Sequence, residues 1–271
     1  KQCAQEGLID VFDFFIRYHE TRPTVDLFVA QDRAETLFQL QSEGQYVLAT
    51  QAKSFAEADS ATNKFAGSTV LDVANRMASE YNAFALPELT LIDEHVQLGR
   101  TVYFQDNQLI GYFNREQSRG YLAAVYTIRN GVMVLDIPDI GTISLKLENT
   151  SSKITADIVD DVPHFQIEVS CKAYISEINQ DLRKKLSLDV YEKFETALNE
   201  KLKLQIESAV EQAVIRDSTD IFNFDVALKQ QQTEYWKVHR DSWAQELAKI
   251  KYTVNVTSSV DRVQQEASPA F

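Results

Sequence analysis

The chain has 271 residues, and its 40 acidic and 27 basic side chains give a net charge of −13 at pH 7. This charge argues against binding to nucleic acid or to anionic lipid, because both need clustered Lys and Arg. Hydrophobic residues make up 44% of the sequence, which is a globular composition with room for about two domains of roughly 100 to 200 residues.

Cysteine content and hydropathy give further expectations. Cys3 and Cys171 are too few for a disulfide framework and match no zinc spacing, and Cys171 is interpreted as a small core residue of a strand. No apolar run approaches the roughly 18 to 20 residues of a membrane helix, so we expect the polypeptide as given to be soluble. The chain begins at Lys1 without Met or a signal peptide, and we expect a segment to precede it.

The N-terminal part predicts a helix, a strand and a second helix. Apolar residues within 8–15 share one helical face, residues 24–30 form an extended run, and Asp32 with Glu35 predicts the start of a helix through Leu37 and Leu40. A lone strand leaves its backbone groups unpaired. Its partners are therefore expected either upstream of the chain or in the sheet of the next domain.

The middle part predicts a connector, a helix and three strands. Residues 44–66, rich in Ala, Ser, Gln and Thr, are the connector; Ser68 is predicted to cap the helix, and Pro87 to mark the return to strand. Asp106-Asn107 predicts a hairpin turn between the last two strands. The apolar helix face comprises Val70, Leu71, Ala74, Met77 and Tyr81. The strands are expected at residues 89–91, 96–104 and 109–113.

The C-terminal part opens with several strands. The strand at residues 164–175 is the clearest, because every second residue from Phe165 to Ile175 is apolar or small while the others are mostly polar. No alternation of strand and helix is present here, so we expect an antiparallel sheet, closed by a strand at residues 252–256. The remaining strands are expected at residues 132–137, 142–147 and 154–159.

Two long helices are predicted to cover that sheet. The first has an apolar stripe at steps of three and four, and Asp189 with Glu192 predicts a capping box at its start. The second carries Trp236 and Trp243, which are interpreted as core residues or interface anchors, with one of them assigned to the core. The stripe of the first helix comprises Tyr191, Phe194, Leu198, Leu202, Ile206, Ala209 and Ala213.

Motifs of catalysis are absent from the sequence. No phosphate-binding glycine loop, metal-binding His spacing or nucleophile motif appears, and the four histidines are interpreted as surface or interface residues. A hydrolase that uses two carboxylates remains an alternative, with Asp160-Asp161 as the adjacent pair, although a solvated loop is the preferred interpretation. We therefore predict no catalytic residue, no cofactor and no metal site.

Three segments resemble the Ger(x)C family, the C subunit of spore germinant receptors. Residues 14–38 match its arginines and a Thr-Val-x-Leu-x-Val-Ala strand, residues 111–120 match Gly followed by Glu-x-x-Arg-Gly, and residues 220–260 match an Asp-Ile-Phe-x-Phe turn, two tryptophans and a closing strand. Glu177 matches a characteristic family Glu. The chain departs from the family at three places. Asn223 stands where Gly is common, Tyr235 stands where Pro is frequent, and Gln264 or Gln265 stands where a Gly often follows the final strand.

The resemblance implies interface or interdomain roles for the matched residues. Gly120 is interpreted as a backbone position that other residues avoid, and Arg119 as a clamp on Glu116 or on the next domain. A structural clamp is preferred over a ligand site. The full set comprises Arg17, Arg22, Glu116, Arg119, Gly120, Glu177, Asp220, Phe222, Phe224, Trp236 and Trp243.

The expected fold is α+β with several domains, each an antiparallel sheet flanked by helices, and with two long helices packed on a sheet in the C-terminal domain. Residues 1–52 are expected to be the remainder of a truncated N-terminal domain, 53–120 a middle domain and 121–271 the C-terminal domain.

The resemblance also implies a function. It implies a non-catalytic lipoprotein, held on the outer face of the spore inner membrane by an upstream lipidated Cys, that acts with integral membrane A and B subunits in receptor assembly or signal transmission. The alternative is a protein that itself binds a small nutrient, in a cleft between the second and third domains.

Overall fold

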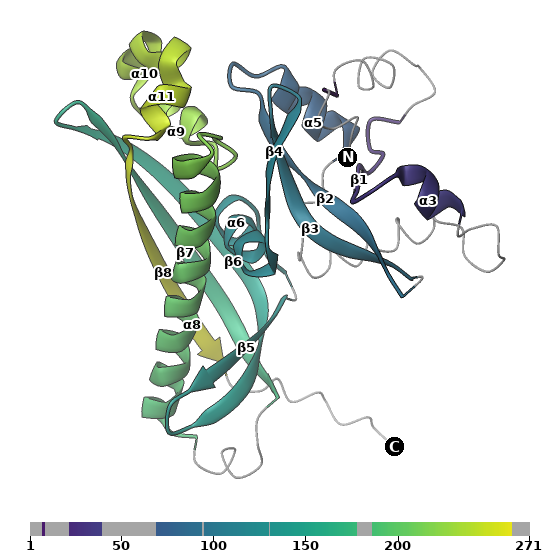
Figure 1. Cartoon of the computed structure of the whole chain (residues 1–271). Coiled ribbons are helices and arrows are strands. Elements are labelled where there is room, and N and C mark those ends of the chain that lie inside the picture. The colour runs from purple at the N-terminus through teal and green to yellow at the C-terminus, as the bar shows by residue number, and fades with distance from the viewer. Residues whose placement is uncertain are drawn as a thin grey trace.

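The computed structural model describes residues 7–8, 22–39, 69–93, 95–129, 131–177 and 186–261. Within these ranges the strands form two four-stranded sheets, each accompanied by helices (Figure 1). The predicted α+β class is confirmed. The predicted helical face at residues 9–15, the connector at 44–66 and the positions Ser68 and Gln264 lie outside the described residues.

The first sheet has the strand order β1-β2-β3-β4. β1 (Val29–Ala30) pairs in parallel with β2 (Ala83–Ile92), so the lone N-terminal strand joins the sheet of the middle part, one of the two expected arrangements. β3 (His95–Gln105) and β4 (Gln108–Phe113) continue it as antiparallel neighbours. Pro87 lies inside β2 rather than before it, next to a register shift where the ladder is already interrupted.

Local signals around this sheet are partly confirmed. Asp106 and Asn107 have φ of 48° and 67°, the left-handed geometry of a type I′ hairpin turn, as predicted. Helix α5 (Val70–Met77) begins after Thr69, whose side chain and Asp72 form a capping box, so the predicted cap was one residue early. Leu71, expected on the apolar face, is 48% exposed. Helix α3 (Ala34–Gln39) lies near the expected position.

The second sheet has the order β5-β6-β7-β8. β5 (Gly131–Ile137), β6 (Gly141–Val159) and β7 (Val162–Glu177) are antiparallel, and β6 joins two predicted strands through an irregularity between Leu147 and Asn149. β8 (Lys251–Asp261) pairs with β7 in parallel, so the expectation of an antiparallel sheet was wrong. The chain crosses back over the sheet through all the C-terminal helices before β8, and such a long crossover permits a parallel neighbour.

The helices over the second sheet also differ from the expectation. Helix α8 (Leu188–Val210) continues as the π-helical turns η2 (Glu211–Arg216), whereas the second long helix is broken into short pieces. The start of α8 is Ser187 with no side-chain cap, so the predicted capping box of Asp189 and Glu192 is not formed. The short pieces are α9 (Phe224–Gln231), α10 (Thr233–His239), η3 (Arg240–Ser242) and α11 (Trp243–Leu247).

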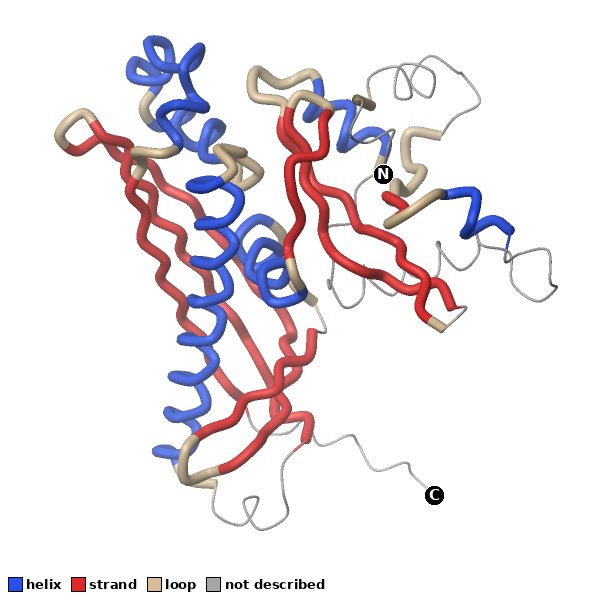
Figure 2. The backbone as a smooth tube through the Cα atoms, viewed as in Figure 1, coloured by secondary structure: helices blue, strands red, loops and turns tan. Residues whose placement is uncertain are grey.

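The main core lies between α8 and the second sheet, and α8 runs along the strands (Figure 2). The predicted stripe of α8 is buried from Phe194 to Ile206, and it meets the buried alternating residues of β7 from Phe165 to Ile175. Each large apolar side chain removed from water in this way contributes about 1.5 to 3 kcal/mol. The core extends into the first sheet through Tyr103 and Phe113.

Cys171 provides a test of the orientation of β7. Its side chain is 4% exposed, and burial raises the pKa of its thiol to about 12, so we expect it to resist a thiol reagent at pH 8 until the domain unfolds. The measurement is labelling in a Cys3→Ser background with and without urea. In the matched control, Ser170→Cys with Cys171→Ser, the thiol faces solvent and should react at once. Rapid labelling of native Cys171 would contradict this strand orientation.

Candidate functional site: the joint between the two sheets

Helix α6 (Arg115–Val125) connects the two sheets and begins directly after β4. Asn114 and Gln117 form a capping box at its start, and the helix is buried from Gly120 to Ala124. The domain boundary predicted between residues 120 and 121 falls inside this helix. The helix therefore connects the two sheets. The region where α6, residues 80–81 and Tyr103 meet α8 and residues 217–243 is called the joint.

Gly120 lies where α6 crosses α8. A Cβ placed on Gly120 would be 2.2 Å from the carbonyl oxygen of Gln205 and 2.6 Å from the amide nitrogen of Ile206. Any side chain would therefore push the two helices apart. The need for glycine comes from this close approach of two backbones, and not from an unusual backbone conformation as the sequence suggested.

Polar side chains flank that crossing. The side-chain amide of Gln205 donates a hydrogen bond to the carboxylate of Glu116, and that of Gln117 donates to the hydroxyl of Ser208 at 3.2 Å. Within the described ranges no ion pair joins Arg119 to Glu116, although the charge of Glu116 partly offsets the lowering of the Arg119 pKa by burial. Glu116 therefore bonds to α8, and among the described residues it forms no ion pair with Arg119.

Tyr103 of β3 and Tyr81, which lies just before β2, both reach the segment that follows η2. The hydroxyl of Tyr103 donates to the carboxylate of Asp217, and the hydroxyl of Tyr81 is 2.8 Å from the carbonyl oxygen of Ser218. The ring of Tyr103 lies over Gly111, where a Cβ would be 2.3 Å from the phenolic oxygen. Gly111, matched in the sequence only as part of a motif, leaves the space that this ring needs.

The Asp-Ile-Phe-x-Phe turn folds around the buried carboxylate of Asp220. This carboxylate accepts hydrogen bonds from the amides of Phe224 at 3.0 Å and Asp225 at 2.7 Å, and from the indole of Trp243 at 3.1 Å. Burial raises the pKa of Asp220, and the three N–H donors oppose that rise. Asn223 takes a left-handed φ of 65°, which Asn tolerates better than most residues, so its replacement of Gly is accommodated.

Aromatic rings from three parts of the chain meet at this turn. Phe224 stacks on Phe165 of β7 at 4.3 Å, and Phe222 meets Tyr121 of α6 edge-on at 5.4 Å. Such pairs contribute about 0.5 to 1.5 kcal/mol beyond their burial. The two phenylalanines therefore join the C-terminal sheet to the connecting helix.

Both tryptophans belong to the core. Trp236 and Trp243 are 3% and 1% exposed and pack at 5.6 Å, so assigning only one of them to the core was wrong. The indole of Trp236 donates to Glu80 at 3.0 Å, and Lys229 pairs with the same carboxylate at 3.0 Å. Glu80 lies beyond α5, so this bond crosses the joint. The sequence carried no signal for the partnership.

Three of the predicted residues are not found at the joint. Arg22 is exposed near the N-terminal strand, and Glu177 is exposed at the end of β7, opposite Ser144 of β6. Arg17 lies outside the described residues. The joint therefore gathers the other matched residues at Glu116, at Gly120 and from Asp220 to Trp243. Sequence analysis missed Glu80, Tyr81 and Tyr103, which bond to the C-terminal part from the N-terminal side of the joint.

Comparison with known proteins identifies the family. Residues 99–264 match the family described as spore germination B3/GerAC like, C-terminal, and residues 1–91 match the spore germination protein N-terminal domain. The chain belongs to the Ger(x)C family. The crystal structure of the GerBC protein has the same fold, with a TM-score of 0.78 at 16% identity, covering 96% of this chain and 76% of that one. Among curated proteins none matches the sequence.

Membership of this family makes the chain a germinant receptor C subunit. The family is one of membrane-associated lipoproteins, and it points to a non-catalytic subunit of a receptor complex. Among the described residues no helix is both long and apolar enough to span a bilayer. The same residues contain no group of three His, Cys, Asp or Glu side chains suited to a metal ion.

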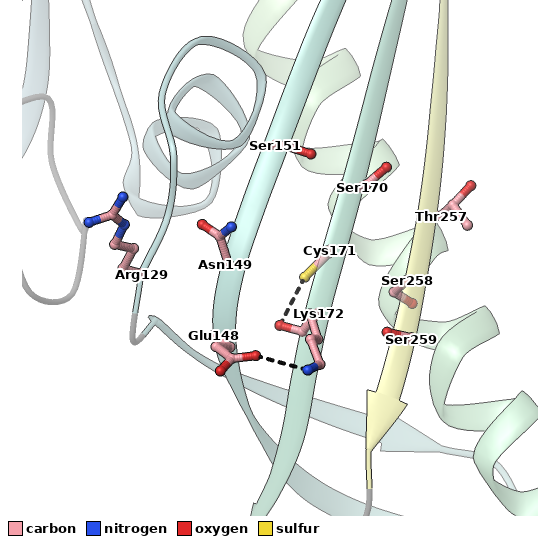
Figure 3. Close-up of a pocket in the computed structure, with 10 residues that line it drawn as sticks. All are labelled: Arg129, Glu148, Asn149, Ser151, Ser170, Cys171, Lys172, Thr257, Ser258 and Ser259. Atoms are coloured by element: carbon pink, nitrogen blue, oxygen red, sulfur yellow. Dashed lines mark hydrogen bonds and ion pairs between the residues drawn. The ribbon is translucent and has the colours of Figure 1, made fainter.

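A groove of about 650 Å³ runs over the outer face of β6, β7 and β8 in this Ger(x)C chain (Figure 3). The residues that line it are mostly polar, and its central cation, Lys172, already pairs with Glu148 at 3.4 Å and Asp261 at 3.3 Å. The thiol of Cys171, which also borders the groove, is held protonated by its raised pKa. This face therefore presents hydroxyl and paired charged groups without an activated nucleophile.

The helix crossing predicts a stability effect. We expect Gly120→Ala to lower the free energy of unfolding by about 1 to 3 kcal/mol, because its methyl group overlaps the backbone of α8. Urea unfolding followed by circular dichroism measures the change. Arg115→Ala, on the exposed first turn of the same helix, is the control and should change stability little. Equal stability of wild type and Gly120→Ala would contradict the close crossing.

The buried acid pair predicts a pH dependence. Burial and the neighbouring Asp220 raise the pKa of Asp225 to about 8, while Arg76 opposes the rise. An unfolded Asp has a pKa of about 3.9, so between these values the folded chain holds a proton that the unfolded chain has lost. This contribution to stability is complete below about pH 4 and is lost as the pH rises to about 8.

Thermal unfolding from pH 5 to pH 9 tests this expectation. Asp225→Asn cannot titrate and should lose less stability than the wild type over that range. Asp241→Asn, which removes an exposed acid, should keep the wild-type slope. Parallel curves for the wild type and Asp225→Asn would show that Asp225 does not carry the proton.

Proposed function

We propose that this Ger(x)C chain is a non-catalytic subunit of a nutrient germinant receptor. Its role is either to transmit a mechanical signal within the receptor or to assemble the receptor subunits. Its expected partners are the integral membrane A and B subunits, and its expected position is the outer face of the spore inner membrane, held there by a lipidated Cys. The observation that carries the proposal is the shared core of the two sheets. A displacement of one sheet therefore displaces the other.

The chemistry of the joint supports a structural role. Its carboxylates are engaged by amides, an indole and a lysine, as at Asp220 and Glu80. Its hydroxyl groups, such as that of Tyr103, donate to acceptors across the joint and carry raised pKa values. Groups committed in this way hold parts together, whereas catalysis requires a group that is available to a substrate.

The polar bonds of the joint also suit signal transmission. They connect Tyr103 of β3 to the segment after η2, Gln117 of α6 to α8, and Glu80, which follows α5, to Trp236 of α10. Packed interfaces of this kind change between discrete arrangements rather than deforming gradually. When a partner protein moves one sheet, the movement therefore changes the position of the other sheet and of the surface that it presents.

Glu177 offers a test of the surface of the second sheet. Because its side chain is exposed at the end of β7, we expect Glu177→Lys to leave the fold and stability unchanged while impairing germination or recovery of the A and B subunits. The measurements are the fall in optical density of spores given nutrient, and co-purification of the receptor. Glu168→Lys, an exposed change on the same strand, is the matched control. Normal germination of the Glu177 variant would remove this residue from the partner surface.

A further inference from the structure

A cavity of about 270 Å³ lies at the joint, between α5, β2, the end of α6 and the start of the Asp220 turn. Pockets for small molecules begin at roughly 300 Å³, so this cavity suits a small metabolite rather than a nucleotide or a peptide. Both sheets contribute to it, through Phe84 of β2 on one side and Ile221 on the other. A ligand bound there touches both halves of the joint.

Arg76 supplies a positive charge to the cavity wall. Within the described ranges its guanidinium has no carboxylate within ion-pair distance and no hydrogen bond. The positive charge of Arg76 lowers the pKa of the buried Asp220 and Asp225, so it lies within electrostatic range of the turn. An arginine with its five donors unused in a cavity is well suited to a bidentate carboxylate.

Asp72 supplies a negative charge one helical turn before Arg76. Both of its hydrogen bonds, from the amide of Thr69 at 2.9 Å and the hydroxyl of Thr69 at 2.7 Å, use Oδ2. In the described part of the chain Oδ1 accepts no hydrogen bond. Residues four apart on a helix commonly pair, yet Asp72 and Arg76 form no ion pair. The two charges therefore line one cavity separately.

Apart from Asn75, the rest of the wall is apolar or aromatic. Val73, Phe84 and Ile221 form an apolar surface, and Tyr121 packs edge-on against Tyr126 at 5.8 Å. This surface suits a compact hydrocarbon group. The nearby carboxylates of Asp72 and Asp220 disfavour a doubly charged anion such as phosphate, because like charges repel at short range in a partly buried site.

We propose that this cavity binds a small zwitterion with an apolar side group. Its carboxylate binds the guanidinium of Arg76, its ammonium group binds Oδ1 of Asp72, and its apolar group lies against Phe84 and Ile221. The site does not depend on the role of the chain in a receptor. It adds a ligand at the contact between the two sheets, where binding stabilises their observed arrangement.

Calorimetric titration of the purified full chain at pH 7 tests the site with matched probes. L-leucine carries both charges, L-leucinamide lacks the carboxylate, and 4-methylpentanoate lacks the ammonium group; L-alanine, L-valine and L-phenylalanine vary the apolar group. We expect at least one of the four zwitterions to bind. For L-leucine, each single-charge analogue should bind on the order of tenfold to a hundredfold more weakly, as for the loss of a charged hydrogen bond.

Two substitutions locate the binding. Arg76→Gln and Asp72→Asn should each weaken zwitterion binding on the order of tenfold or more, and Asn at position 72 keeps an oxygen for the cap of α5. Lys203→Gln, which removes an exposed cation from α8, should bind as the wild type does. Circular dichroism of each variant verifies that it is folded.

Three results would overturn the proposal. The first is no binding of any of the four zwitterions up to about 10 mM, which corresponds to an affinity too weak to define a site. The second is equal affinity for L-leucine and L-leucinamide. The third is undiminished binding by folded Arg76→Gln.

Discussion

The arrangement of the C-terminal half depends on one buried carboxylate. Asp220 receives two backbone amides and the indole of Trp243, so a single side chain starts helix α9 and anchors the last helix before β8. A buried charge without such donors would cost several kcal/mol, which makes the turn and the tryptophan mutually dependent. Phe222 and Phe224 are presented by the same turn, one to α6 and the other to β7.

The joint combines this turn with the crossing at Gly120, and the two act differently. The crossing brings the backbones of α6 and α8 into direct contact, which fixes their separation. The tyrosine and tryptophan bonds instead fix direction, because a hydrogen bond weakens steeply when its angle changes. Separation and direction together define the position of one sheet on the other. A covering of apolar contacts alone would leave the sheets free to slide.

Features with a local cause were predictable from the sequence. The alternation of β7, the stripe of α8 and the Asp106-Asn107 turn each follow from neighbouring residues, and each is present. Features that depend on residues distant in the sequence were not predictable. The parallel pairing of β8 with β7 joins residues about ninety positions apart, and Trp236 finds Glu80 across 156 positions. The prediction of a second long helix failed for a related reason. Apolar periodicity continues through the breaks, whereas Gln232, which follows the end of α9, donates a hydrogen bond to the backbone of β6, a partner distant in the sequence.

The departures from the family pattern show how such a joint tolerates change. Asn223 adopts the left-handed conformation that Gly would adopt freely, so the amides of the turn still reach Asp220. Tyr235 stands where Pro is frequent, and its ring stacks on His239 at 3.9 Å at the edge of the main core. Neither change alters a group that crosses the joint. A residue that affects the conformation of only one element is therefore the easiest to substitute. Substitution is most constrained where a residue contacts an element across the joint, as Gly120 contacts α8 and Tyr103 contacts Asp217.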